Sequence, residues 1–289
     1  MSKKFNRFDL QKMKDSGEQV VWITAYDFAT AQFAEKAGMD MLLVGDSAAM
    51  TMLGLDNTLG IGMDEMLVLA RAVCRAASRS FVIGDLPFLS YQPSNADAVR
   101  NAGAFIRAGC DAVKCEGGAR VMNRVGAISD AGIAVMGHLG LTPQSLGQLG
   151  GYRVQGKSLD AAEHLAEDAR ALELAGAFAI LIEAVPAQTA AYVRESVDIP
   201  VYGIGAGPHV DGQLVISHDM LGSFVGDIKP RFVKRYAELD QVIEEAFRNY
   251  AEEVRSRQFP GPEHAYPIEL DQETAIRERR RVAQTGDVS

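Results

Sequence analysis

The segment Met41-Leu-Leu-Val-Gly-Asp46 is an apolar run that ends on an acidic residue. The same arrangement returns four more times along the chain, each time with Asp, Glu or His at its end. These copies are Phe81-Val-Ile-Gly-Asp85, Ala112-Val-Lys-Cys-Glu116, Ala134-Val-Met-Gly-His138 and Phe178-Ala-Ile-Leu-Ile-Glu183. Short apolar runs rich in β-branched residues predict buried strands. A segment long enough for a helix follows each run, so strands and helices alternate.

This alternation, with a period of roughly 30 to 40 residues, predicts a (β/α)8 TIM barrel in a single α/β domain. The rival is a doubly wound open sheet, which would gather its chemistry at one crevice instead of spreading it over several strands. Further strands are expected at 20–26, 200–207 and 214–217, and helices at 231–255. We expect a catalytic barrel with C-terminal helices over residues 1–267. Residues 268–289 form a tail, and whether it is ordered is left open.

The composition excludes several classes of protein. The chain has 289 residues, is 47% hydrophobic and carries a net charge of −9, which does not suit binding to nucleic acid or to an anionic membrane. No apolar stretch approaches the roughly 18 residues of a membrane span, and no apolar segment follows the charged N-terminus. Cys74, Cys110 and Cys115 lack CxxC spacing and are typical of reduced thiols. We therefore expect a cytoplasmic protein without nucleic-acid or membrane partners.

The carboxyl ends of barrel strands meet at one mouth, so Asp46, Asp85 and Glu116 are expected to lie together there. Carboxylates at such close range repel one another unless a cation neutralises them. A set of oxygen ligands without Cys or paired His suits Mg²⁺ or Mn²⁺ rather than zinc. Each acid alone could equally cap a helix or form a salt bridge, but three successive strand ends favour a metal site.

Three further side chains are candidates at the same mouth. Lys114 precedes Glu116 by two residues, so both face the barrel interior, where a lysine needs an anionic substrate or a salt bridge. A Schiff base on Lys114 is the weaker alternative. His138 either forms a structural hydrogen bond or donates to a substrate oxygen. Glu183 ends a wholly apolar strand, which suits a general base, with a salt bridge to a neighbouring strand as its alternative.

Several longer motifs are shared with one known family. They include Ile23-Thr-Ala-Tyr-Asp27, Val44-Gly-Asp-Ser47, Lys114-Cys-Glu-Gly-Gly118, Gly137-His-Leu-Gly-Leu-Thr-Pro-Gln144, Gly151-Tyr-Arg-Val-Gln-Gly156 and Phe259-Pro-Gly-Pro-Glu-His264. From about Phe8 to Tyr266 the chain resembles ketopantoate hydroxymethyltransferase, and the motif that ends at Gln144 is the most specific. The resemblance implies a barrel of the phosphoenolpyruvate/pyruvate type.

The resemblance also implies an activity. It is the transfer of a hydroxymethyl group from 5,10-methylenetetrahydrofolate to the 2-oxo acid 3-methyl-2-oxobutanoate, in pantothenate and coenzyme A synthesis. Carried over by motif, Asp46, Asp85 and Glu116 hold Mg²⁺, and Glu183 accepts the proton. The implied substrate contacts are Asp46, Ser47, Asp85, Lys114 and His138. The family is typically a decameric homo-oligomer, which implies self-association here.

One region departs from the family pattern, because Leu55 and Leu69 stand where the family usually has histidine. Our hypothesis is that enolisation survives while substrate or folate contacts along this loop have changed. A diverged paralogue acting on another 2-oxo acid is therefore an alternative. A carbon–carbon lyase or mutase of the isocitrate lyase and phosphoenolpyruvate mutase type is a second one, although the Lys-Lys-Cys-Gly-His loop of the lyase is missing. A non-catalytic scaffold is the third.

Overall fold

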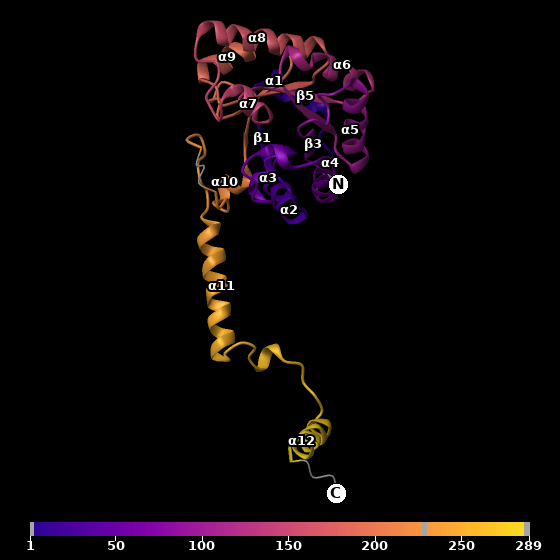
Figure 1. Cartoon of the computed structure of the whole chain (residues 1–289), viewed down its shortest axis with the longest axis vertical. Helices are drawn as coiled ribbons and strands as arrows, with labels where there is room; N and C mark the ends of the chain where they lie inside the picture. Colours follow the sequence, from indigo (N-terminus) through magenta and orange to yellow (C-terminus); the bar gives the residue numbers. More distant parts are fainter. Residues whose placement is uncertain (1–2, 227–229, 286–289) are drawn as a thin grey trace. The chain divides into compact units, whose positions relative to one another are not determined.

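The computed structural model describes residues 3–226 and 230–285, and the chain divides into two compact units at Glu238. The first unit contains a closed barrel of eight parallel strands, which confirms the predicted fold class (Figure 1). Each strand pairs with the next along the chain, and the eighth pairs with the first. The second unit contains the last two long helices. The expected boundary after residue 267 stays a prediction.

The strands are short and most of their residues are buried. They are β1 Val20–Thr24, β2 Met41–Val44, β3 Phe81–Asp85, β4 Ala112–Glu116, β5 Val135–Gly140, β6 Ala179–Glu183, β7 Val201–Ile204 and β8 Gly212–Val215. Burial on both faces explains why these strands are continuous apolar runs rather than alternating ones. The polar exceptions at their ends are the residues that build the site below.

Helices connect the strands of the first unit. They are α1 Arg7–Ser16, α2 Phe28–Ala37, α3 Ala48–Thr51, α4 Met63–Ala76, α5 Asn95–Ala108, α6 Met122–Asp130, α7 Leu146–Leu149, α8 Leu159–Leu174, α9 Ala187–Glu195 and α10 Ser217–Leu221. Short 3₁₀ turns add η1 Thr58–Gly60, η2 Ala119–Val121 and η3 Pro143–Ser145. The second unit holds α11 Leu239–Ser256, η4 Pro262–His264 and α12 Leu270–Thr285. Among the described residues, none of these helices is long and apolar enough to cross a membrane.

Two apolar cores support the barrel. One lies between the strands and the surrounding helices and includes Phe105 and Leu172. The other fills the barrel interior around Trp22 and Tyr202, where Leu10 of α1 joins it. Because both faces of each strand are packed, the strand ends are held rigidly, and side chains there keep fixed positions relative to one another.

A serine side chain caps the N-terminus of each of the helices α5 and α8. The Ser94 hydroxyl accepts from the Asp97 N–H at the start of α5, and the Ser158 hydroxyl accepts from the Ala161 N–H at the start of α8. Serine is a favoured N-cap residue, and such caps are typically worth about 1 kcal/mol each. The expected helix over 231–255 is wrong at its beginning, because α11 starts only at Leu239.

Candidate active site

Four buried polar side chains lie in register on neighbouring strands. Asp85 at the end of β3 pairs with Lys114 on β4, and Glu116 at the end of β4 pairs with His138 on β5. Because side chains alternate along a strand, residues 114 and 116 both point inward, while the intervening Cys115 belongs to the core between strands and helices. The structure thus brings these predicted site residues together at one mouth of the barrel.

Lys114 lies at the centre of the acidic cluster. Its Nζ is 2.7 Å from Asp85 Oδ1 and 3.5 Å from Glu116 Oε1. It is also 3.3 Å from His138 Nδ1. Burial alone lowers the pKa of Lys114, but Asp85, Glu116 and Asp46 outweigh it and raise that pKa above its ordinary value. Lys114 therefore remains a cation in the cavity.

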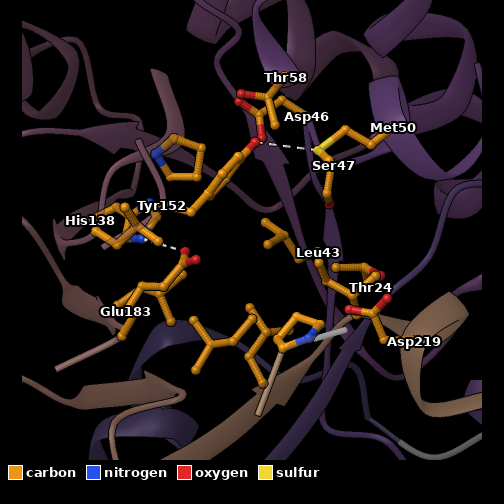
Figure 2. A pocket seen from close by; sticks show the side chains of 18 of the residues that line it. Thr24, Leu43, Asp46, Ser47, Met50, Thr58, His138, Tyr152, Glu183 and Asp219 are labelled. Atoms are coloured by element: carbon orange, nitrogen blue, oxygen red, sulfur yellow. Dashed lines mark hydrogen bonds and ion pairs between the residues drawn. The ribbon is translucent and has the colours of Figure 1, made fainter. Parts of the chain in front are cut away.

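His138 connects the buried acids to the candidate base. Its Nδ1 is 3.3 Å from Glu116 Oε1. Its Nε2 is 3.2 Å from Glu183 Oε2 (Figure 2). Burial lowers the pKa of His138 and Lys114 lowers it further, yet the nearby carboxylates of Glu116 and Glu183 raise it overall. The side chain of Glu183 is 16% exposed, whereas those of Glu116 and Asp85 are 1% exposed. Among these three acids, Glu183 has the most exposed side chain.

Gln144 joins the acids from the opposite side, and sequence reasoning did not single it out. Its backbone N–H donates to Glu116 Oε2 at 2.9 Å, and its side-chain Nε2 donates to Asp46 Oδ2 at 2.9 Å. Its Oε1 accepts from the Tyr91 hydroxyl at 3.1 Å. One buried residue therefore fixes two of the three predicted metal ligands. It is the last residue of the most specific family motif, which was the available signal.

The electrostatics of the three acids differ. Burial raises the pKa of Asp46 well above its ordinary value, and repulsion from Asp85 and Glu116 adds to this. Burial likewise raises the pKa of Asp85, although Lys114 opposes it. For Glu116 burial also acts upward, but Lys114, His138 and the Gln144 N–H together lower its pKa. Asp46 and Asp85 therefore have raised pKa values, and a further cation nearby would lower both by favouring the ionised carboxylates.

The donor set fits a hard divalent cation in its chemistry. Asp46, Asp85 and Glu116 offer oxygen atoms alone, and the Asp46 N–H donates to Asp85 Oδ2 at 3.0 Å, so these two acids are adjacent. In the described part of the chain, however, no three His, Cys, Asp or Glu side chains are already arranged around a common metal position. A bound divalent cation would therefore require these carboxylates to turn toward a common point.

A cavity of about 360 Å³ opens at this mouth. Its lining includes all seven predicted site residues, namely Asp46, Ser47, Asp85, Lys114, Glu116, His138 and Glu183. Ser47 Oγ lies 2.7 Å from the Tyr26 hydroxyl, which fixes its direction. Tyr152 and Asp219 also line the cavity and were not predicted (Figure 2). Burial raises the pKa of Asp219 to about 6, with Arg235 opposing.

The two departures from the family pattern lie away from this cavity. Leu55 is 39% exposed and contacts its own loop, where a Cβ on Gly60 would come within 2.8 Å of Leu55 Cδ1. Leu69 on α4 packs against the core between strands and helices. Neither leucine is among the residues that line the cavity. Leu69 therefore has a packing role in this fold, whereas Leu55 lies on the surface of its loop.

A closed parallel barrel with a lysine-bridged acid cluster and a partly exposed glutamate at its mouth is the arrangement of an α/β-barrel enzyme. The model of the ketopantoate hydroxymethyltransferase family matches residues 4–262, and the chain belongs to this family. It is 53% identical over 269 residues to a 3-methyl-2-oxobutanoate hydroxymethyltransferase from Alkaliphilus metalliredigens, covering 93% of this chain and 95% of the relative. Identity to the protein of the same name from Carboxydothermus hydrogenoformans is 51% over 260 residues, covering 90% and 94%.

Similar solved structures support the fold. A phosphonopyruvate hydrolase in complex with oxalate and Mg²⁺ has a TM-score of 0.60 at 14% identity, and the match covers 98% of this chain and 100% of that one. A 2,3-dimethylmalate lyase of the phosphoenolpyruvate mutase and isocitrate lyase superfamily has a TM-score of 0.58 at 18% identity, covering 97% and 98%. At such low identity these likenesses show the barrel type and carry no activity to this chain.

Proposed function

We propose that this protein transfers a hydroxymethyl group from 5,10-methylenetetrahydrofolate to 3-methyl-2-oxobutanoate and so forms 2-dehydropantoate (ketopantoate) for pantothenate and coenzyme A synthesis. One observation carries the proposal most directly. Glu183 is a partly accessible carboxylate, held at 3.2 Å by His138 Nε2, at the mouth of a cavity that also contains a buried ammonium group. A carboxylate so placed can remove a proton from carbon.

The metal is proposed to be Mg²⁺, with Mn²⁺ as a substitute, held by Asp46, Asp85 and Glu116. The raised pKa values of Asp46 and Asp85 support this assignment, because a cation would favour their ionised forms. When bound, Mg²⁺ supplies Lewis acidity that polarises the ketone of a 2-oxo acid. The adjacency of Asp46 and Asp85 supports a shared position for the ion.

The protein side chains divide the remaining work. Glu183 accepts the proton from C3 of the oxo acid, and His138 holds the glutamate in place. Lys114 offers positive charge to the developing enolate or to the substrate carboxylate, because Asp85 and Glu116 keep it charged inside the cavity. Ser47, whose Oγ lies 2.7 Å from the Tyr26 hydroxyl, is proposed to donate to a substrate oxygen. The enolate carbon C3 then forms the new C–C bond to the methylene carbon of the folate, and both C–N bonds to that carbon break. Water supplies the hydroxyl group and one proton, Glu183 returns the other proton, and tetrahydrofolate leaves with both nitrogens protonated.

We further propose that the protein is a cytoplasmic homo-oligomer. Large apolar side chains recur at helical spacing on α11, and several are exposed, including Val242 at 59%, Phe247 at 71% and Tyr250 at 58%. An amphipathic helix with such a stripe is stable in water when another surface covers it. A second copy of the chain would supply that surface in the manner typical of the family. Sedimentation of the protein and of a Phe247→Glu variant measures this directly.

The decisive experiment separates enolisation from group transfer. In D₂O with Mg²⁺ and 3-methyl-2-oxobutanoate, proton NMR should show loss of the C3 signal without folate, and ketopantoate once 5,10-methylenetetrahydrofolate is added. The Glu183→Gln variant should show neither the exchange at C3 nor formation of ketopantoate, while its Mg²⁺ affinity stays within about twofold of the wild-type value. Glu163→Gln, an exposed change on α8, is the matched control. Wild-type exchange in the Glu183 variant would refute the base assignment.

A further inference from the structure

A second cavity of about 460 Å³ lies beside the catalytic one, between the loops that follow β3, β4 and β5. The two cavities share Glu116 in their linings. Gln144, which donates to Asp46, also lines the second cavity. A ligand in the second cavity would therefore contact Glu116 or Gln144, which belong to or touch the acid cluster. None of the roles proposed above involves a ligand in this second cavity.

Two guanidinium groups line the second cavity without acidic partners. Arg120 donates to Gln148 Oε1 at 2.6 Å and to Ser145 Oγ at 2.5 Å. Arg124 donates to Asn95 Oδ1 at 2.5 Å. These acceptors are neutral, and within residues 3–226 and 230–285 neither arginine forms an ion pair with a carboxylate. The two guanidinium groups thus donate only to neutral acceptors, although Glu116 also lines the cavity, and planar guanidinium groups suit carboxylate ligands.

The opposite wall is apolar and accessible. Phe88 is 37% exposed and Leu89 is 58% exposed, and both line the cavity. Leu89 has a φ of +61°, a left-handed conformation that is uncommon for a residue with a branched side chain. Strained backbone of this kind is concentrated at ligand sites, where it holds a side chain in a needed position. An aromatic or aliphatic group would find a favourable surface here.

We propose that the second cavity binds the aminobenzoyl-glutamate end of the folate donor, with Arg120 and Arg124 pairing with its glutamyl carboxylates and Phe88 and Leu89 contacting its aromatic ring. This inference rests on the proposed function. This end of the folate is a flat aromatic ring followed by carboxylates. The ring suits the apolar side chains of the cavity, and the carboxylates suit its two arginines. The reactive carbon of the same molecule must reach the catalytic cavity, which adjoins this one at Glu116.

Arg153 and Arg231 are the competing anchors, since both line the catalytic cavity. The test therefore measures binding of tetrahydrofolate and of tetrahydropteroate, which lacks the glutamyl group, to the Mg²⁺-loaded protein by calorimetry. The variants are Arg120→Gln, Arg124→Gln and Arg153→Gln. Arg71→Gln on the exposed face of α4 is the matched control. Folate-independent deuterium exchange at C3 of the oxo acid checks that each variant retains its catalytic cavity.

Loss of one charge-assisted pair should raise the Kd for tetrahydrofolate by about tenfold or more in each of the Arg120 and Arg124 variants. The Kd for tetrahydropteroate should change by less than about twofold, because the ring contacts remain. Unchanged tetrahydrofolate binding in both variants, or a loss found only with Arg153→Gln, would overturn the assignment. An equal loss for both ligands would also overturn it, because the arginines would then not recognise the glutamyl group. Absence of deuterium exchange in the wild type would instead overturn the proposed function, and this inference with it.

Discussion

Replacing Lys114 with methionine removes the ammonium group at the centre of three buried acids while keeping most of the side chain's volume. Nζ lies 2.7 Å from Asp85 and 3.5 Å from Glu116, and the side chains of Lys114 and these two acids are at most 3% exposed. Removing one partner of a buried ion pair typically costs about 3–5 kcal/mol, because the remaining charge is left uncompensated. At about 2–4 °C per kcal/mol for a unit of this size, the melting temperature of the metal-free variant should fall by roughly 6–20 °C.

Scanning calorimetry in EDTA at about pH 8 measures this loss, and the exposed Lys157→Met variant is the control. Burial already raises the pKa values of Asp46 and Asp85. Acids whose folded pKa is raised destabilise the fold when ionised, so the deficit should shrink as the pH falls through those pKa values. Saturating Mg²⁺ should also stabilise the variant more than the wild type. A variant that melts within about 2 °C of the wild type in EDTA would refute the view that Lys114 neutralises the acids.

Three further changes test other parts of the structure. Gln144→Leu removes the amide that donates to Asp46, so calorimetry should show about 10- to 100-fold weaker Mg²⁺ binding; unchanged affinity would refute its positioning role. Glu35→Gln should cost about 1 kcal/mol in urea unfolding at neutral pH. The deficit should vanish as the pH falls through the lowered pKa of Glu35, whose carboxylate accepts from Ser80. Gly84→Ala places a Cβ 2.3 Å from Phe105 Cδ1 and should cost about 1–3 kcal/mol, which Phe105→Leu should partly restore.

The barrel and its acid cluster could be predicted because both depend on local patterns. The five residues Phe81–Asp85 are enough to indicate a buried strand that ends on a polar side chain. The geometry of a parallel barrel then brings the polar ends of its strands together. The helix starts at Ser94 and Ser158 follow equally local capping rules. Nothing beyond neighbouring residues was needed for these predictions.

The partners of the acids could not be predicted in the same way. Gln144 reaches Asp46 across 98 positions of sequence, from a glycine-rich loop that has no helix or strand period. Asp219 lies on α10, after the strand with the weakest sequence pattern, so the sequence did not predict which way its side chain points. Its place in the cavity depends on the path of the chain after β8. The start of α11 was misplaced for the same reason. Tyr236 donates its N–H to the Met220 carbonyl, so this stretch packs on the barrel instead of continuing a helix.

The difference in exposure between Glu183 and the other acids has a consequence for the fate of the abstracted proton. A base as buried as Asp85 would hold its proton away from bulk water and return the same isotope to carbon, and labelling would then be slower than enolisation. At 16% exposure the carboxyl group of Glu183 can trade its proton with solvent during the lifetime of the enolate. Internal return should therefore be limited, and loss of the label from C3-deuterated 3-methyl-2-oxobutanoate in H₂O should keep pace with enolisation.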